Sequence, residues 1–332
     1  MPYFSYVQYI LYISTHISTT MNNTTCNKIS FEFKTKFLPP VLSCVFVVSL
    51  VANGWGLKSL LHNWKKLGSV NVFVLNLGLA DVLYLLTVPF LVVYYSMEDK
   101  WVFGTTFCKI TRFCFNLNLY GTIGFLTCIS VYRYLAIVHP MTELGRITAK
   151  RSVVVSVMVW LFVAAQSIPD MFYPKSRVNG DPQCYDTTGA TFVEDYLYYS
   201  LGWTLIGFLI PFLIMLGCYG HVIVILCSKN ISDKVLKQNC LKLLFILILL
   251  FSVCYIPFHL LKNLNLYSRV LERRKICHEW SERVYVANQI SRALVCLNCA
   301  LNPLVYLHGD IVAKFRQLLH QIRNTFICWT GS

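Results

Sequence analysis

The chain has 332 residues, of which 56% are apolar and only 13% are charged, and its mean hydropathy is +0.56. Soluble domains carry charge on roughly 25% of their residues, so this composition excludes an ordinary soluble protein and indicates a membrane protein. The formal net charge of +14 must therefore be placed in loops, in the tails or at special sites inside the membrane.

Seven stretches are long and apolar enough to cross a bilayer as helices, which takes about 20 residues each. They predict an all-α membrane protein, a seven-transmembrane-helix bundle with a short amphipathic cytoplasmic helix. The predicted domains are an extracellular N-terminus over 1–37, the helical domain over 38–307, and the amphipathic helix and tail over 308–332. The spans are expected at about 38–61, 72–95, 107–132, 153–173, 197–227, 241–264 and 285–307.

The distribution of Lys and Arg among the loops indicates the orientation, because short cytoplasmic loops normally carry the excess. Segments 58–66, 133–151 and 229–242, with the C-terminal tail, hold 14 basic residues against three acidic ones. The opposite set is balanced, with 11 of each, and it contains overlapping N-x-T glycosylation sites at Asn22 and Asn23. We therefore predict a multi-pass plasma-membrane protein whose N-terminus is extracellular.

The two ends of the chain carry further signals. The first twenty residues lack the basic segment of a signal peptide, so a start at Met1, with an extracellular extension, and a start at Met21 both stay open. Over 310–322, apolar residues recur at intervals of three, four and seven, which predicts a helix lying on the cytoplasmic membrane surface. Cys328 beyond it is either a palmitoylation site or an unmodified tail cysteine.

Besides the basic residues counted above, four cations lie inside the predicted spans, each toward the extracellular end. Such a charge costs about 2.5–3.5 kcal/mol on insertion scales and marks a functional cavity unless the side chain reaches the headgroups. Snorkelling of this kind is an equal alternative for Lys109, whereas the other three cations have polar companions one helical turn away. The pairs are Arg112 with Asn116, Lys262 with His259, and Arg292 with Gln289.

Three helices therefore offer a polar stripe at similar depth. If the stripes face one cavity, we expect it to hold three cations and no acid from the helices to neutralise them. Such a cavity is suited to a polyanion, because guanidinium groups bind phosphate and carboxylate oxygens in bidentate fashion. Tyr120, Phe115 and Phe258 lie where they can add aromatic walls, although ordinary packing is the more frequent role of such residues.

The same helices carry a series of residues that resembles the rhodopsin-like G-protein-coupled receptors. The resemblance covers about residues 37–320 and implies a receptor that works by shifting a conformational equilibrium, without covalent chemistry. It assigns Arg133, Tyr219 and Tyr306 to G-protein coupling. The markers are Asn53, LNLGLAD ending in Asp81, Cys108, VYRY around Arg133, Trp160, Pro211, Tyr219, CYIP with Pro257, and NPLVY at 302–306.

Within that class the chain is similar to the P2Y family of purinergic nucleotide receptors. The shared segments are WVFG at 101–104, NLYG at 118–121, CYDTT at 184–188, SVCYIPFHLLK at 252–262 and QISR at 289–292. The resemblance implies activation by extracellular ADP, ATP, UDP or UTP, with signalling through a heterotrimeric G protein, phospholipase C and calcium. The candidate ligand-binding residues are Arg112, Asn116, Tyr120, Asp186, His259, Lys262, Arg269, Gln289 and Arg292.

Other functions stay open to different degrees. The nearest alternative is a receptor of the same fold for another anion, such as a dicarboxylate, a lipid phosphate or an acidic peptide. A transporter or channel is a remote alternative, because it would be expected to show internal repeats or broken helices at the midplane. We expect no enzyme, because no catalytic triad, phosphate-binding glycine loop or metal cluster is found. The expected partners are the ligand, a G protein and membrane lipid, and no nucleic acid.

The resemblance also implies an ion site and two disulfides. Asp81, Asn118, Thr122, Asn298 and Asn302 resemble the sodium-binding cluster of the class, where oxygen ligands suit a hard cation. A water-filled hydrogen-bond network without an ion is the alternative, and no other cofactor is expected. Four cysteines on the extracellular side allow three pairings, of which the resemblance implies Cys108 with Cys184 and Cys26 with Cys277.

Overall fold

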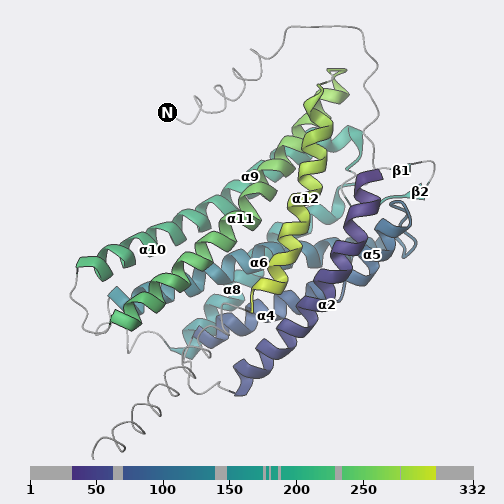
Figure 1. The fold of residues 1–332 in the computed structure, drawn as a ribbon. Helices are drawn as coiled ribbons and strands as arrows, with labels where there is room; N and C mark the ends of the chain where they lie inside the picture. The colour runs from purple at the N-terminus through teal and green to yellow at the C-terminus, as the bar shows by residue number, and fades with distance from the viewer. Residues whose placement is uncertain are drawn as a thin grey trace, which may run out of the picture.

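The computed structural model describes residues 32–62, 70–138, 148–174, 177–178, 181–185, 188–228, 234–276 and 278–303. Nearly all of them are helical, and the long helices run alongside one another in an elongated bundle (Figure 1). This confirms the predicted all-α fold class. The helices are α2 (Glu32–His62), α4 (Val70–Leu85), α5 (Val88–Ser96), α6 (Thr105–Val138), α8 (Ala149–Phe172), α9 (Val193–Thr204), η2 (Leu205–Leu209), α10 (Ile210–Ser228), α11 (Lys234–Arg273) and α12 (Trp280–Leu301), with a short 3-10 turn, η1 (Ala190–Phe192).

Each predicted span corresponds to one helix or to one continuous run of helices. Within the described residues, six of these are long and apolar enough to cross a membrane, namely α2, α4 with α5, α6, α8, α9 through α10, and α12. The remaining span lies within α11, which packs against α9 and α12. On α8, Val154, Met158 and Leu161 are each more than 60% exposed. Such an apolar outer face is unfavourable in water and is suited to lipid.

Two of the spans change their helical pattern close to a proline. The second span breaks between α4 and α5, just before Pro89, because proline lacks an N–H donor and its ring clashes with the preceding turn. The fifth span passes through the π-helical turn η2 shortly before Pro211. Within η2, a Cβ on Gly207 would lie 2.9 Å from the Tyr120 ring and 2.7 Å from Gln166 Nε2. The turn therefore brings the backbone of this span close to α6 and α8.

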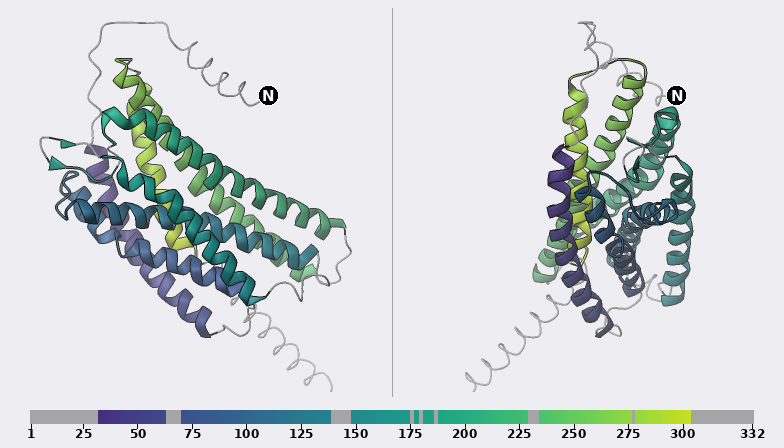
Figure 2. Two further views of the ribbon diagram at one scale, coloured as in Figure 1. Left: turned by 180° about the vertical axis from the view of Figure 1, so that it is seen from behind. Right: turned by 90° about the vertical axis from the view of Figure 1, so that its right-hand side faces the viewer.

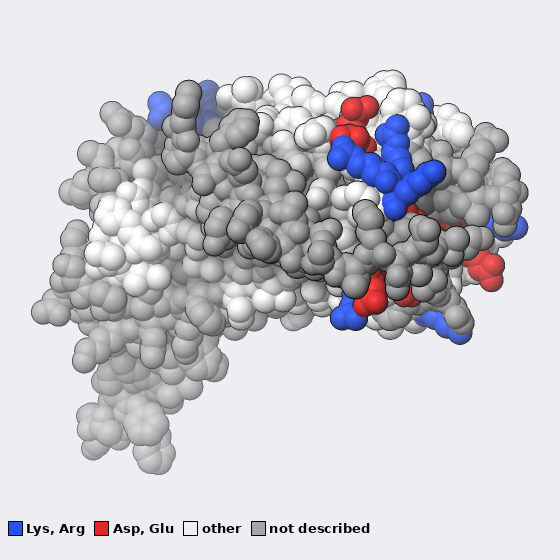
Figure 3. All heavy atoms as spheres, turned by 90° about the horizontal axis from the view of Figure 1, so that it is seen from above, with Lys and Arg blue, Asp and Glu red and all other residues white. Residues whose placement is uncertain are grey.

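A short hairpin and a disulfide mark one end of the bundle. Strands β1 (Arg177–Val178) and β2 (Asp181–Pro182) pair antiparallel near the start of α2 (Figures 1 and 2). Cys108 at the head of α6 is bonded to Cys184 just after the hairpin, with 5.6 Å between their Cα atoms. The predicted Cys108–Cys184 pairing is thus confirmed. We refer to this end as the disulfide end, and the face seen in Figure 3 carries side chains of Lys and Arg beside those of Asp and Glu toward this end. Both Cys26 and Cys277 lie outside the described residues.

Two large apolar clusters, together with a smaller one between α9 and α11, hold the described helices together. The larger one fills the middle of the bundle, where Leu77 and Ile123 are fully buried and Phe251 is 2% exposed. The second cluster lies toward the disulfide end and packs α2 and α5 around Trp101, Tyr94 and the disulfide. Lipid is as apolar as these side chains, so helices in a membrane are held together by close van der Waals packing rather than by the hydrophobic effect. The two clusters supply that packing and fix the relative positions of the helices that carry the polar residues.

Candidate ligand-binding site

A cavity that opens to the surface lies between α6, α8, α9, α11 and α12 at the disulfide end. It brings together residues from all three predicted polar stripes, because Arg112, Lys262 and Arg292 line the same space. Tyr185, which follows the disulfide, also lines it, and burial raises the pKa of its phenol, which stays neutral at physiological pH. The lining residues are Arg112, Phe115, Asn116, Asp170, Tyr185, Thr188, Tyr196, Phe258, Lys262, Asn265, Leu266, Arg269, Asn288 and Arg292.

Three cations of the cavity come from α11 and α12, and we call Lys262, Arg269 and Arg292 the cationic wall. Arg292 Nη1 donates to the Tyr95 hydroxyl at 3.0 Å, and Arg269 Nη2 donates to the Thr188 carbonyl at 2.6 Å. The ammonium group of Lys262 lies 5.8 Å from the Tyr196 ring centroid and 5.9 Å from that of Phe258. These contacts to a hydroxyl, a carbonyl and two aromatic rings orient the three cations.

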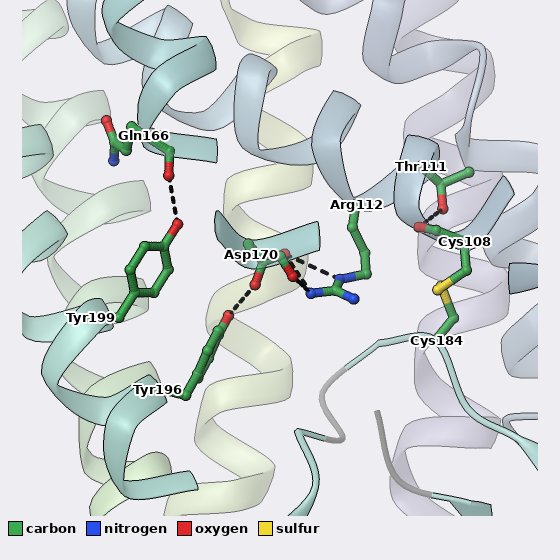
Figure 4. A network of polar contacts seen from close by, with 8 residues as sticks. All are labelled: Cys108, Thr111, Arg112, Gln166, Asp170, Cys184, Tyr196 and Tyr199. Carbon is green, nitrogen blue, oxygen red and sulfur yellow. Dashed lines mark hydrogen bonds and ion pairs between the residues drawn. A yellow bond between two sulfur atoms is a disulfide. The ribbon is translucent and has the colours of Figure 1, made fainter. Parts of the chain in front are cut away.

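Arg112, on the opposite side of the cavity, is engaged by an acid. Its Nη2 lies 2.8 Å from Asp170 Oδ2 and its Nε donates to the same oxygen at 3.1 Å, while Nη2 also donates to the Asp170 carbonyl (Figure 4). The Tyr196 hydroxyl donates to Asp170 Oδ1 at 2.7 Å. The expectation that no helix supplies an acid was therefore wrong, because Asp170 lies in α8 and lines the cavity.

The other predicted ligand-binding residues fall into two groups. Asn116 lines the cavity, whereas Tyr120, His259 and Gln289 are buried and are not among its lining residues. The His259 ring stacks on Phe208 with 4.4 Å between ring centroids, and its Nδ1 lies 3.4 Å from Thr204 Oγ1. Asp186 lies outside the described residues. His259 and Gln289 thus share a helix with a cavity cation but point into the packed interior.

One intramembrane cation does not reach the cavity. Lys109 is exposed on α6, and its ammonium group lies 5.7 Å from the Phe172 ring centroid. This position corresponds to the snorkelling alternative rather than to ligand contact.

Sequence reasoning missed Asp170, Asn265 and Asn288. Asp170 stands inside the fourth apolar stretch, so a search of the spans for acids as well as cations would have found it. Asn265 follows Lys262 by three residues, and Asn288 precedes Arg292 by four. Extending each polar stripe by one turn would have added both amides. Tyr196 carried no such signal, because an aromatic residue in an apolar stretch is indistinguishable from packing.

A second polar cluster surrounds Asp81, which is fully buried in α4. Asn118 Nδ2 donates to Oδ1 at 2.8 Å, and Asn302 Nδ2 donates to Oδ1 at 2.9 Å and to Oδ2 at 3.0 Å. Asn298 Nδ2 donates to Asn302 Oδ1 at 3.0 Å and to the Tyr255 hydroxyl at 2.6 Å. Thr122, also buried, belongs to the predicted set. The Asp81 carboxylate, the amide oxygens and the Thr122 hydroxyl are the kind of oxygen ligands that a sodium ion requires. The amides must rotate to bind an ion, because Asn118 and Asn302 now direct their N–H groups at the carboxylate.

The other end of the bundle carries the residues assigned to G-protein coupling. Tyr219 in α10 shares a hydrogen bond with Ser130 of α6, one turn before Arg133. Tyr134 and His221 make a second link between these helices, with 3.0 Å between the hydroxyl and Nδ1. Several predictions fall outside the described residues, namely Tyr306, the 310–322 helix, Cys328, Asn22 and Asn23.

Comparison with known proteins gives one family and a consistent set of relatives. Residues 52–306 match the family described as 7 transmembrane receptor (rhodopsin family). P2Y purinoceptor 1 of Meleagris gallopavo is 38% identical over 292 residues, which cover 87% of this chain and 80% of the relative. P2Y purinoceptor 1 of Homo sapiens is 37% identical over 286 residues, with 85% and 76% covered. P2Y purinoceptor 4 of Xenopus laevis is 33% identical over 301 residues, with 88% and 55% covered.

Proposed function

Because the chain belongs to the rhodopsin family of seven-transmembrane receptors and is of the P2Y purinoceptor type, we propose that it is a receptor for extracellular nucleotides. It is a receptor and not an enzyme, and it is a multi-pass protein of the plasma membrane. The observation that carries the proposal is the cationic wall, which faces an open cavity at one end of the bundle.

The phosphate chain of the nucleotide is assigned to the cationic wall. Arg269 and Arg292 present N–H groups suited to phosphate oxygens, and Lys262 adds a compact positive charge. A hydrogen bond to a charged group contributes about 1.5–3 kcal/mol, so three such cations would supply about 4.5–9 kcal/mol of interaction with the phosphates, and the aromatic and amide contacts must help to offset the cost of association.

The base and the sugar are assigned to the uncharged parts of the lining. Phe115, Phe258 and Tyr185 offer aromatic faces, and the amides of Asn265 and Asn288 offer both donors and acceptors. An amide can serve the hydrogen-bonding edge of a purine or of a pyrimidine. The proposal therefore includes adenine and uracil nucleotides, and Asn116, one helical turn after Arg112 on α6, is a further candidate for discriminating between them.

Ligand binding is proposed to act on the middle of the bundle through α11. Phe258 lines the cavity, while the adjacent His259 stacks on Phe208, which in turn stacks on Phe251 at 5.7 Å. Phe251 contacts Tyr255, whose hydroxyl accepts from Asn298 beside the Asp81 cluster. A ligand that binds one arrangement of these groups more tightly than another shifts the equilibrium by that difference in affinity.

The topology completes the proposal. The disulfide end, with the N-terminus, Asn22, Asn23 and a Cys26–Cys277 bridge, is assigned to the extracellular side. Arg133, Tyr219 and Tyr306 are assigned to contact with a heterotrimeric G protein, and the 310–322 helix with Cys328 is assigned to the cytoplasmic leaflet. Signalling through phospholipase C and calcium is the proposed output.

Sodium is proposed as a ligand of the Asp81 cluster, held by the carboxylate with Asn118, Thr122, Asn298 and Asn302. A buried carboxylate needs either a cation or hydrogen-bond donors beside it. The amides of Asn118 and Asn302 donate to Asp81 here, and a sodium ion can take the place of these donors. When bound, the ion would neutralise Asp81 and hold α4, α6 and α12 in one arrangement.

Cytosolic calcium measured in cells without endogenous nucleotide receptors tests the proposal. Cells expressing the chain are challenged with ADP, ATP, UDP, UTP, two dicarboxylates and a lysophospholipid. We expect a saturable response to at least one nucleotide, and its loss in Arg292→Gln at equal surface expression. A response to a dicarboxylate or to the lysophospholipid alone would move the ligand to another anion within the same fold.

A further inference from the structure

Three arginines near the end of α11 contact successive parts of one segment, residues 188–194, which we call the rim segment. Arg269 lines the cavity, whereas Arg273 and Arg274 lie beyond its lining residues. We propose that Arg273 and Arg274 are positioning residues of the ligand site, because they hold the rim segment on α11 and thereby lengthen the time that a nucleotide stays bound. This inference rests on the proposed function and extends the site to residues that lie outside the cavity.

The spacing of the arginines matches the segment that they contact. Arg269 and Arg273 are four residues apart and Arg274 follows directly, so the three side chains leave α11 from neighbouring positions on one face. Their partners occur in the same order along the rim segment and three residues apart, namely Thr188, Thr191 and Glu194. The contacts therefore follow the segment along its length rather than meeting it at one point.

Each of the two outer contacts joins one guanidinium nitrogen to one oxygen. Arg273 Nη1 donates to the Thr191 carbonyl at 3.1 Å, and Arg274 Nη2 lies 2.8 Å from Glu194 Oε1. The Arg274 and Glu194 side chains are 58% and 36% exposed, and an exposed ion pair alone adds little stability. Such contacts can loosen and re-form without unfolding the receptor, which suits them to positioning a segment rather than to supporting the fold.

Two further contacts place the rim segment between α8 and α11. Val193 is 1% exposed and belongs to the small apolar cluster that contains Leu266 and Val270 of α11. On the other side, the Gly189 N–H donates at 2.9 Å to the carbonyl of Pro174, which follows α8. The arginines therefore form the outer attachment of a segment whose inner side is packed against the bundle.

The rim segment also supplies part of the cavity wall. Thr188 lines the cavity and is 2% exposed, and its carbonyl accepts from Arg269 of the cationic wall at 2.6 Å. If the outer attachment loosens, Thr188 and Arg269 can move away from a bound ligand. A wall that is held less firmly shortens the life of the complex and so acts mainly on the dissociation rate, whereas positive charge near an entrance acts on the association rate.

Binding kinetics on membranes that contain the full-length receptor separate these two effects. The probes are radiolabelled ADP, ATP, UDP and UTP. We expect Arg273→Gln/Arg274→Gln to raise the dissociation rate of every nucleotide that binds by about threefold to tenfold, with an association rate within about threefold of the wild type. Lys275→Gln is the matched control, because it removes an exposed cation beside Arg274 that is not one of the three arginines. Its dissociation rate should stay within about twofold of the wild type.

The conservative variant Arg273→Lys/Arg274→Lys should restore slow dissociation. An ammonium group can replace a guanidinium that uses one nitrogen for each contact, although it cannot replace a bidentate one. Dissociation in this variant is expected within about twofold of the wild type. Dissociation as fast as in the glutamine variant would overturn the inference. Both double variants change exposed residues, so their melting temperatures should stay within about 2 °C of the wild type.

Hydrogen exchange in the ligand-free, full-length receptor tests the attachment without any nucleotide. The amides of the rim segment should exchange faster in Arg273→Gln/Arg274→Gln than in the wild type, and at the wild-type rate in Lys275→Gln. Unchanged exchange in the glutamine variant, or faster exchange with an unchanged dissociation rate, overturns the inference. Faster exchange in a receptor whose wild type binds no nucleotide supports the attachment and refutes the proposed function.

Discussion

At the scale of single residues, the placement of charges inside the bundle decides what the cavity can bind. The rule that an intramembrane cation marks a cavity correctly selected Arg112, Lys262 and Arg292. The same reasoning missed Asp170, because its position near the end of an apolar stretch resembles the loop charges that follow. Which cation is already neutralised depends on how α6 and α8 face each other, and sequence spacing along one helix carries no information about that.

Removing only the basic partner of the buried pair should be costly. In Arg112→Gln, Asp170 stays buried and keeps the hydrogen bond from the Tyr196 hydroxyl but loses the Arg112 cation, and we expect a loss of about 3–5 kcal/mol in the free energy of unfolding. The matched control is Arg274→Gln, which breaks the exposed 2.8 Å pair with Glu194 and should cost less than about 1 kcal/mol. Thermal unfolding in detergent compares the two, and equal losses would contradict the account of the buried pair.

Sodium should stabilise the receptor through Asp81. We expect the melting temperature in sodium chloride to exceed that in choline chloride at the same ionic strength, because the ion neutralises a fully buried carboxylate. Asp81→Asn should abolish this difference while keeping a side chain of the same shape. Thermal unfolding in the two salts is the measurement. A difference of the same size in the variant would assign the cluster to a hydrogen-bond network without an ion.

At the scale of elements, the seven spans were predictable, whereas their internal changes of pattern were not. A long apolar stretch in lipid forms a helix, because its backbone N–H and C=O groups find no water there and must hydrogen-bond to each other within the segment. Hydropathy alone therefore locates the helices. The break before Pro89 follows from the missing N–H of proline. The π-helical turn at Leu205–Leu209 lies just before Pro211, which cannot donate to the carbonyl four residues earlier, but the surrounding apolar stretch does not show that a π-helical turn rather than a break forms there.

Filling the space at Gly207 should destabilise the bundle. A Cβ in Gly207→Ala would lie 2.9 Å from the Tyr120 ring, and such overpacking typically costs about 1–3 kcal/mol. Gly202→Ala, five residues earlier, is the control: no atom lies within 4 Å of its Cβ, and the higher helix propensity of alanine favours it. The melting temperatures of the two variants should move in opposite directions. A Gly207→Ala variant as stable as the wild type would show that Tyr120 can move aside.

At the scale of the whole molecule, the fold and the approximate place of the cavity were predictable, but the full lining was not. The order of markers from Asn53 to Asn302 fixed the fold, and the polar stripes indicated the correct end of the bundle. The spacing of His259 with Lys262 and of Gln289 with Arg292 did not show which member faces the cavity. Helix rotation settles that question, and it depends on the packing of the whole bundle.

The disulfide should matter for binding as well as for stability. It joins α6 to the segment that brings Tyr185 and Thr188 to the cavity. In Cys108→Ser/Cys184→Ser we expect a lower melting temperature and at least a tenfold weaker nucleotide affinity, because that segment loses its attachment. Cys44→Ser, which replaces an exposed free cysteine, is the control. Unchanged affinity in the double variant would mean that the segment is held by other contacts.

The most direct test of the central claim is saturation binding of radiolabelled nucleotide to membranes that contain the receptor, since this readout does not depend on the coupled G protein. The account predicts saturable binding, reduced about tenfold to hundredfold in Arg292→Gln, where one charged contact to phosphate is lost. Arg283→Gln removes an exposed arginine of the same helix and should bind as the wild type does. No saturable nucleotide binding by the wild type, or equal affinity in Arg292→Gln, would contradict the account.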